Sequence, residues 1–411
     1  MFKNARALLL IQIANQFLPL LLVPYLAHTL GAELYGLVAF GTSIVAIATV
    51  LTDYGFNLSV TLEIAKRRQH RVFVNRLIGA VMLSKTALVC IATTGIAIYA
   101  LTSEKYAEHF IFILLLILPT AVQAFQPVWL FQGIEKMGYI AVFTLFSRVV
   151  QIAMIFIFIK SPQDYTSVVL INAAAAFIGL ALAFSFLCRE GYRPTWPGYK
   201  YSLLIVRRST TFFWSRAAVS TYTAGGTIFL GLFSSPVQVA YYAAAEQIYK
   251  GVQGLYAPLS QALYPNLVRT KNFGLLARVI KFSTLSCMVG AVIGVFAGEA
   301  VIGMLFGSEF HGAYAVLLVF LLTLLINTPS VLLGYPMLGA LGQANLANRS
   351  VMYAGIVQFL LLGIFASVGW TEALHTAFSV LFVEAMVLVM RVYWANKCHA
   401  VWKAGLVEKK L

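Results

Sequence analysis

The first apolar run of this 411-residue chain contains a polar stripe at helical spacing. Gln12, Asn15 and Gln16 stand at positions i, i+3 and i+4, which share one face of a helix. Pro19 and Pro24 follow and can kink a membrane-spanning helix. Such amides either face a cavity or bond to neighbouring helices and hold a bundle together. The sequence leaves both interpretations open.

A second, longer polar stripe begins with a cation. Arg216 is followed at helical spacing by Ser220, Thr223 and Thr227. An ionisable group at membrane depth is costly, so it marks a functional candidate. Arginine binds phosphate through two parallel hydrogen bonds, and it does so best where the dielectric is low. If Arg216 faces a central cavity, we expect the ligand to be an anion.

Further charges inside apolar runs are candidates for ligand binding or ion coupling. Lys85 and Lys250 are cations that an anionic ligand could contact, and Glu246 is one helical turn from Lys250 and can pair with it. Asp53 and Glu246 could take up protons during transport, or could equally be structural partners of nearby cations. Arg391 is expected to snorkel to the cytoplasmic interface.

Membrane-spanning helices are needed to position these residues. The chain is 61% hydrophobic and 10% charged, whereas soluble proteins carry about 25% charged residues. A helix needs about 20 apolar residues to cross a bilayer. The apolar runs predict an all-α integral membrane protein of about twelve transmembrane helices, near 7–27, 36–56, 78–101, 109–131, 139–159, 166–187, 210–233, 238–264, 282–305, 313–335, 350–369 and 372–394.

The basic residues outside these spans are distributed asymmetrically. Nearly all of them fall in alternate loops, and the opposite side holds only Lys105 and Lys160. By the positive-inside rule, this pattern predicts that both termini are cytoplasmic. It also explains the net charge of +15 without nucleic-acid binding.

A basic stretch with glycines and prolines divides the chain into halves of six spans. We expect an N-terminal six-helix lobe at 1–188, a basic cytoplasmic linker at 189–209, a C-terminal six-helix lobe at 210–396 and a basic cytoplasmic tail at 397–411. Short segments of the two halves match weakly at a common offset. Parallel repeats of this kind are typical of transporters that rock two bundles around a central site.

No catalytic or metal-binding pattern is present in the sequence. The six histidines lack metal-ligand spacing, and neither a nucleophile elbow nor a phosphate-binding loop occurs. The predicted external loops are too short to house an active site. We therefore expect a transporter without a cofactor or a metal, and not an enzyme.

Four segments carry a resemblance to a known family. The chain resembles the polysaccharide transporters, the Wzx-type O-antigen flippases, in the segments Leu30–Gly36, Asp53–Ser59, Glu63–Ala65 and Trp129–Met137. The resemblance covers the whole chain in length and predicted topology. Its sharp motifs lie in the first third of the chain, and the second half matches by architecture.

The resemblance implies membership of the multidrug/oligosaccharidyl-lipid/polysaccharide exporter superfamily, with two six-helix lobes around a central cavity. Such flippases move an undecaprenyl-diphosphate-linked oligosaccharide from the cytoplasmic to the periplasmic leaflet of the bacterial inner membrane. The cations would shield the diphosphate, and the two polar stripes would hydrogen-bond the sugars. Membrane lipids surround such a protein. Coupling to protons or sodium ions stays open, as does binding to a polysaccharide polymerase and a chain-length regulator.

Three other functions compete with this hypothesis. A cation-coupled multidrug exporter of the same superfamily would favour acidic and aromatic cavity residues over the cations found here. A lipid II flippase typically has two additional spans. A membrane-embedded polysaccharide polymerase or glycosyltransferase should carry a large external loop with catalytic residues.

Overall fold

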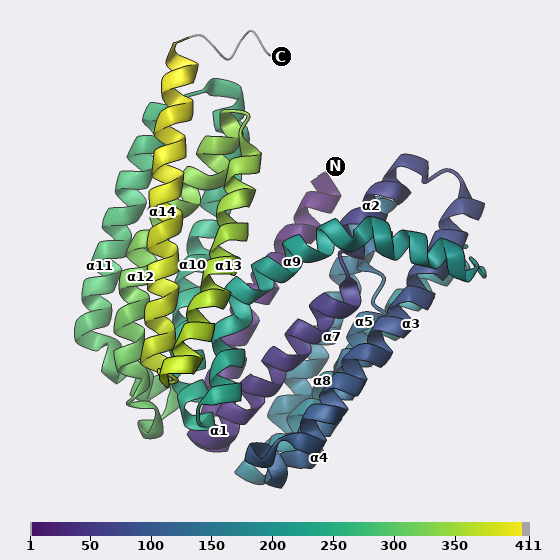
Figure 1. Cartoon of the computed structure of the whole chain (residues 1–411), viewed down its shortest axis with the longest axis horizontal. Helices are drawn as coiled ribbons and strands as arrows, with labels where there is room; N and C mark the ends of the chain where they lie inside the picture. The colour runs from purple at the N-terminus through teal and green to yellow at the C-terminus, as the bar shows by residue number, and fades with distance from the viewer. Residues whose placement is uncertain (1, 405–411) are drawn as a thin grey trace. The chain divides into compact units, whose positions relative to one another are not determined.

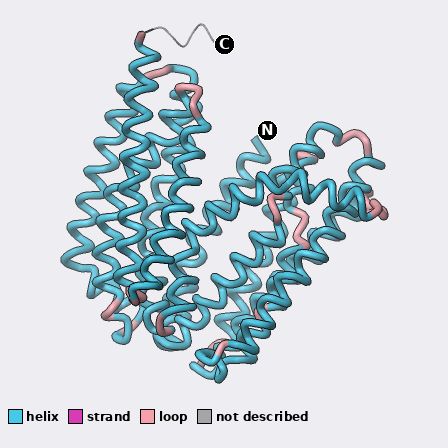
Figure 2. Tube along the Cα trace, viewed as in Figure 1, coloured by secondary structure: helices cyan, strands magenta, loops and turns pink. Residues whose placement is uncertain are grey.

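The protein is helical throughout. The computed structural model describes residues 2–404, with the side chains of residue 12 and of residues 18–404 apart from residue 257. Helices joined by short loops account for this range, and no strand occurs within it (Figure 2). The prediction of an all-α membrane protein is confirmed. Of the predicted tail, residues 405–411 lie outside the described part.

The first compact unit, called unit 1, contains Met1–Leu22 and Val38–Ala217. It holds most of α1 (Phe2–Asp53) and the beginning of α9 (Tyr199–Phe233). Its other helices are α2 (Phe56–Arg67), α3 (Arg71–Thr102), α4 (Phe110–Leu115), α5 (Ile117–Ala124), α6 (Val128–Gly133), α7 (Met137–Phe158) and α8 (Tyr165–Arg189). Trp129, Phe131 and Phe56 are fully buried in its core. The motif Trp129–Met137 thus supplies packing residues.

The second unit, called unit 2, contains Val23–Leu37 and Ala218–Leu411. Its long helices lie side by side, with α12 packed against α10, α11 and α14 (Figure 1). A π-helical segment, η4, directly follows α12. The bounds are α10 (Pro236–Thr270), α11 (Phe273–Phe306), α12 (Ala313–Leu332), η4 (Leu333–Gly339), α13 (Ala344–Val368) and α14 (Ala373–Lys403).

The short segment 23–37 is fixed to unit 2 at a break in α1. Gly31 has φ 76° and ψ 172°, a conformation that favours glycine. The backbone N–H of Ala32 donates to Oε2 of Glu309 at 2.8 Å, and His28 Nε2 lies 3.1 Å from the carbonyl oxygen of Met304. Part of the predicted N-terminal lobe therefore packs with unit 2, which the apolar pattern does not reveal.

Nine helical segments of residues 2–404 are long and apolar enough to cross a membrane. One of them, Leu18–Arg67, includes the break at Gly31 and so overlaps both of the first two predicted spans. The seventh and eighth predicted spans lie in α9 and α10, which are long helices but are not among the nine. The helical segments thus correspond to the predicted pattern of about twelve spans.

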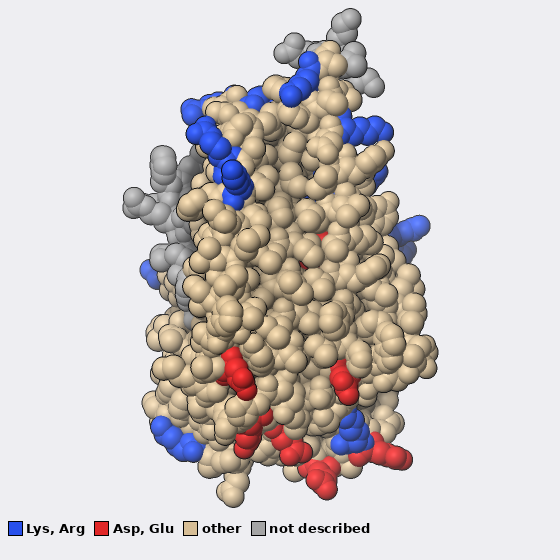
Figure 3. Space-filling model, turned by 90° about the vertical axis from the view of Figure 1, so that its left-hand side faces the viewer, with Lys and Arg blue, Asp and Glu red and all other residues tan. Residues whose placement is uncertain are grey.

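The surface charges are asymmetric as well. On the face drawn in Figure 3, Lys and Arg gather toward one end, and Asp and Glu gather toward the other with a few Lys or Arg among them. Such a separation is typical of helices that cross a bilayer with their basic ends on the cytoplasmic side. The orientation of the termini itself stays a prediction.

Candidate functional site

Asp53 and Lys85 form a buried ion pair in unit 1. Asp53 is the last residue of α1, and its Oδ1 lies 3.7 Å from Nζ of Lys85 in α3. The two residues are 8% and 3% exposed. Nζ of Lys85 also donates to the carbonyl oxygen of Ala124 in α5 at 2.7 Å. Both charges therefore have partners within the unit, as expected for a structural pair.

A left-handed turn between α1 and α2 places Asp53. Tyr54 has φ 44° and Gly55 has φ 77°. A Cβ on Gly55 would lie 2.7 Å from Cβ of Phe212 in α9, so this position has no room for a larger residue. The ring of Tyr54 stacks on that of Phe213 at a centroid distance of 4.6 Å. The motif Asp53–Ser59 thus fixes the end of α1 against α9.

Arg216 lies on α9 and is exposed. It interacts electrostatically with Asp53, so the structure brings Arg216, Asp53 and Lys85 into one charged cluster of unit 1. Farther along α9, Ser220 is half-buried, Thr223 is exposed and Thr227 is buried. The polar stripe is therefore continuous along the helix but differs in accessibility from turn to turn.

The amides of the first predicted stripe are described only in part. Gln12 on α1 is half-buried. Asn15 and Gln16 lie outside the residues whose side chains the structure describes. Their contribution to ligand binding stays a prediction.

Glu246 and Lys250 on α10 form the ion pair that their spacing allows. Oε2 of Glu246 lies 2.7 Å from Nζ of Lys250. The Lys250 side chain is 45% exposed, whereas that of Glu246 is 14% exposed. The ammonium is thus the more accessible member of the pair and could contact a second anion.

A buried polar network in unit 2 surrounds Glu384 on α14. The hydroxyl of Tyr222 and Nδ2 of Asn327 both donate to Oε1 of Glu384, the latter at 2.8 Å. Gln253 Nε2 donates to Oδ1 of Asn327 at 2.9 Å. The network joins α9, α10, α12 and α14. The sequence does not reveal this network, because it does not show which direction each helix faces.

Arg391 does not snorkel, contrary to the expectation from its sequence position. It is 9% exposed. Its Nε donates to the hydroxyl of Ser350 at 3.0 Å, and its Nη1 donates to the carbonyl oxygen of Ser330 at 2.9 Å. It also interacts electrostatically with Glu384. Internal hydrogen-bond partners therefore hold the guanidinium inside the bundle.

A polar group on α7 and α8 was not assigned a role from the sequence. Nη1 of Arg148, an exposed residue, donates to Oε1 of Gln151 at 2.9 Å. Nε2 of Gln151 in turn donates to Oδ1 of Asn172 at 2.6 Å. The signal that could have revealed the pair is the i, i+3 spacing of Arg148 and Gln151 inside an apolar run.

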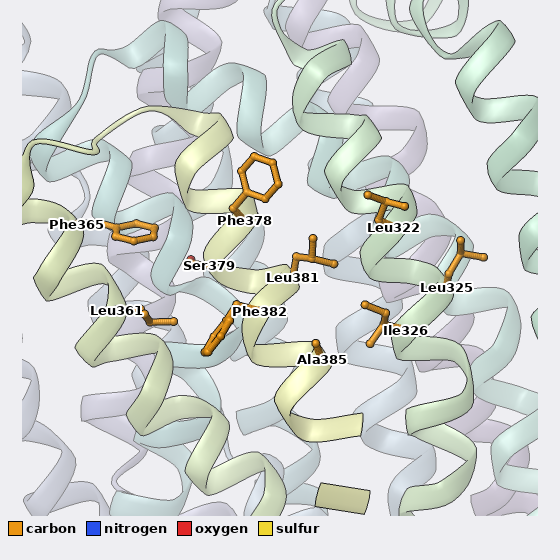
Figure 4. Close-up of a pocket in the computed structure, with 10 residues that line it drawn as sticks. All are labelled: Leu322, Leu325, Ile326, Leu361, Phe365, Phe378, Ser379, Leu381, Phe382 and Ala385. Atoms are coloured by element: carbon orange, nitrogen blue, oxygen red, sulfur yellow. The ribbon is translucent and has the colours of Figure 1, made fainter. Parts of the chain in front are cut away.

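Unit 2 also contains an apolar cavity of about 730 Å³ between α12, α13 and α14 (Figure 4). Its lining includes Phe365, Phe378 and Phe382. The one hydroxyl in the lining belongs to Ser379 and already accepts a hydrogen bond from Nε2 of Gln358 at 2.8 Å. This cavity therefore offers hydrocarbon surface and no site for a charged ligand.

None of these groups has the arrangement of a metal site. Within the described part of the chain, no group of three or more His, Cys, Asp and Glu side chains could hold a metal ion. The clusters around Asp53, Glu246 and Glu384 consist of charges and hydrogen-bonding groups. Such groups can bind a polar or charged ligand in the membrane.

Comparisons with known proteins point to one family. The family described as "Polysaccharide biosynthesis protein" matches residues 1–271. A candidate O-antigen transporter of Escherichia coli (strain K12) is 29% identical over 404 residues, which cover 93% of this chain and 96% of the relative. A candidate O-antigen transporter of Shigella dysenteriae is 27% identical over 95% of this chain and 98% of its own length.

Solved structures share the fold at low sequence identity. The lipid II flippase MurJ in an inward closed conformation has a TM-score of 0.73 at 13% identity, covering 96% of this chain and 88% of its own. An inward-facing MATE multidrug transporter of the MOP superfamily has a TM-score of 0.66 at 12% identity, covering 94% and 96%. These matches confirm the predicted fold. The apolar helices, the family match and the relatives described as candidate O-antigen transporters indicate a multi-pass inner-membrane protein.

Proposed function

Because the chain belongs to the polysaccharide biosynthesis protein family, we propose that it is a flippase for undecaprenyl-diphosphate-linked oligosaccharide repeat units. It moves them from the cytoplasmic to the periplasmic leaflet by alternating access. The observation that carries this proposal is the match to relatives described as candidate O-antigen transporters over 96% and 98% of their lengths. The shared fold with a lipid II flippase supports it, since lipid II is itself a lipid-linked cargo.

The charged clusters provide groups suited to this cargo. A diphosphate must be shielded while it crosses about 30 Å of hydrocarbon. Arg216 is exposed and can bind phosphate oxygens with two hydrogen bonds. Lys250 presents a partly exposed ammonium. Lys85 is buried against Asp53, so in our proposal it acts on the cargo through the charge of the cluster and not by direct contact.

The sugars need hydrogen-bonding groups along the path. Ser220, Thr223 and Thr227 on α9 and Gln12 on α1 are the described residues that we assign to this role. We assign Asn15 and Gln16 to it as well, on their spacing alone. Ion coupling through Asp53 or Glu246, with protons or sodium, is a further part of the proposal.

A complementation experiment tests the function. The gene is deleted in its native strain, and lipid-linked repeat units and surface polysaccharide are measured with the wild-type chain, Arg216→Ala or Arg207→Ala supplied in trans. Arg207 is an exposed arginine earlier on α9 and serves as the control. We expect the deletion and Arg216→Ala to accumulate lipid-linked units and lose long polysaccharide, and Arg207→Ala to restore it.

One result would contradict the proposed function, and a second would correct its binding site. Intact surface polysaccharide in the deletion strain, together with increased drug sensitivity, would instead favour a multidrug exporter of the same fold. Full restoration by Arg216→Ala at normal expression would remove Arg216 from the binding site but would leave the flippase assignment to the deletion result.

A further inference from the structure

A polar cavity of about 200 Å³ lies in unit 1 where α2, α3 and α9 meet. Its lining combines two cations, one acid and two hydroxyls with apolar side chains. The polar members are Lys66, Arg208, Glu63, Ser59 and Ser209. None of them belongs to the charged cluster around Asp53.

The rim of this cavity carries a surplus of positive charge. Nη1 of Arg208 lies 3.9 Å from Oε1 of Glu63, and the two side chains are 60% and 35% exposed. Lys66, one turn beyond Glu63 on α2, is exposed as well. The guanidinium of Arg76 lies over the ring of the neighbouring Tyr201, 4.6 Å from its centroid. The single acid therefore neutralises only part of the cationic rim.

The apolar part of the lining has a buried floor and an accessible side. Val60, Leu77 and Ile205 in the floor are 2%, 0% and 4% exposed. On the accessible side, Leu62 is 51% exposed and Phe212 is half-buried. Between the floor and the rim, the hydroxyls of Ser59 and Ser209 lie 2.7 Å apart. A ligand that fills this space has to present an anion to the rim and carbon atoms to the accessible apolar side.

We propose that this cavity binds the phosphate-bearing headgroup of a lipid at the cytoplasmic face of the membrane. Lys66 and Arg208 contact the phosphate oxygens, and the first carbons of the lipid lie on Leu62 and Phe212. Basic pockets between membrane helices on the cytoplasmic side characteristically bind anionic headgroups. The basic residues of this region put the cavity on the side that the positive-inside rule assigns to the cytoplasm.

Free phosphate fits the same rim but not the apolar side of the cavity. It would leave the apolar surface without contacts, and the dispersion energy of those contacts would be lost. The lipid phosphate has two sources: the diphosphate of the lipid-linked cargo, or a bulk anionic phospholipid. Binding of a lipid phosphate requires only that the chain lies in the membrane. Binding of the cargo diphosphate rests in addition on the proposed function.

Binding measurements on the purified full-length protein in detergent test the site. The probes are farnesyl diphosphate, a short-chain phosphatidylglycerol and inorganic pyrophosphate. We expect both lipid probes to bind more tightly than pyrophosphate. Loss of two cations in the double variant Lys66→Ala, Arg208→Ala should weaken lipid binding by about tenfold to thirtyfold.

A matched double variant controls for net charge. Arg278→Ala with Lys281→Ala removes two exposed cations from α11 in unit 2 and should leave binding unchanged. Glu63→Gln, which removes the acid from the rim, should tighten binding. Equal weakening by the two double variants, or weaker binding by Glu63→Gln, would overturn the proposal, and so would pyrophosphate binding as tightly as the lipid probes.

The same measurements separate the two sources. Tighter binding of farnesyl diphosphate, with displacement of phosphatidylglycerol, assigns the site to the cargo, and equal binding assigns it to bulk phospholipid. No transport is required in this assay. If the headgroup site is wrong, the two double variants bind the lipid probes equally well in vitro. If the proposed function is wrong, surface polysaccharide stays intact in the deletion strain.

Discussion

Asp53 and Lys85 neutralise each other inside unit 1, with 3.7 Å between carboxylate oxygen and ammonium. Breaking a buried pair by removing one partner leaves an uncompensated charge, whereas replacing both partners can be nearly neutral. A structural role and an ion-coupling role of this pair therefore predict opposite effects on export when both residues are replaced.

Removing Lys85 alone should destabilise the protein strongly. We expect Lys85→Met to cost about 3–5 kcal/mol, because Asp53 is then buried without its cation. The double variant Asp53→Asn, Lys85→Met should recover most of this loss. Thermal unfolding in detergent measures both. If the recovered double variant also supports polysaccharide export, Asp53 and Lys85 are structural partners. A stable but inactive double variant would give the pair a role in transport, through ion coupling or through the charge of the cluster.

Arg391 should stabilise unit 2 through its hydrogen bonds to Ser330 and Ser350. Arg391→Ala removes the donor to Ser330 and Ser350 and the cation near Glu384, and should cost about 2–3 kcal/mol in unfolding free energy. The exposed Arg349 on α13 provides a matched control, and Arg349→Ala should be near neutral. Equal unfolding temperatures of the two variants would show that Arg391 reaches water at the cytoplasmic interface, as its sequence position predicts.

Stability should fall in acid partly through Glu190. The ammonium of Lys136 donates to its carboxylate and holds the pKa of Glu190 below its usual range, with a further hydrogen bond from the hydroxyl of Tyr139. The resulting stabilisation is complete above the unfolded pKa of about 4.3 and is lost as the pH falls through the folded pKa. Unfolding temperatures measured between about pH 6 and pH 2 should therefore fall less for Glu190→Gln than for wild type.

An exposed acid in unit 2 provides the comparison for this pH series. Glu33→Gln should follow the wild-type profile. If Glu190→Gln also followed the wild-type profile, the ion pair with Lys136 would not contribute to stability.

Gly31 should be difficult to replace. A Cβ at this position meets Oε2 of Glu309 at 3.0 Å, and the positive φ is unfavourable for any other residue. We expect Gly31→Ala to cost about 1–2 kcal/mol. A Cβ added to Gly363 on α13 would meet no neighbouring atom within 4 Å, so Gly363→Ala should be neutral or stabilising. Thermal unfolding would contradict this account if both variants behaved alike.

The spans and the charge asymmetry could be predicted because both follow from hydropathy along the chain. The Glu246–Lys250 pair could be predicted because it is local to one helix turn. The partners of Arg391 could not be predicted, since they come from α12 and α13 and depend on how each helix is rotated. Likewise, the packing of residues 23–37 with unit 2 depends on Gly31 and Glu309, which are far apart in sequence.

Transfer of a lipid-linked oligosaccharide between leaflets can be measured with the purified protein. The full-length protein is reconstituted into vesicles that contain a fluorescent undecaprenyl-diphosphate oligosaccharide, and the fraction protected from an added glycosidase is followed. We expect wild-type protein to equilibrate the lipid between leaflets and Arg216→Ala to slow this exchange. Exchange no faster than in protein-free vesicles, from wild-type protein that is folded and correctly inserted, would contradict the proposed function.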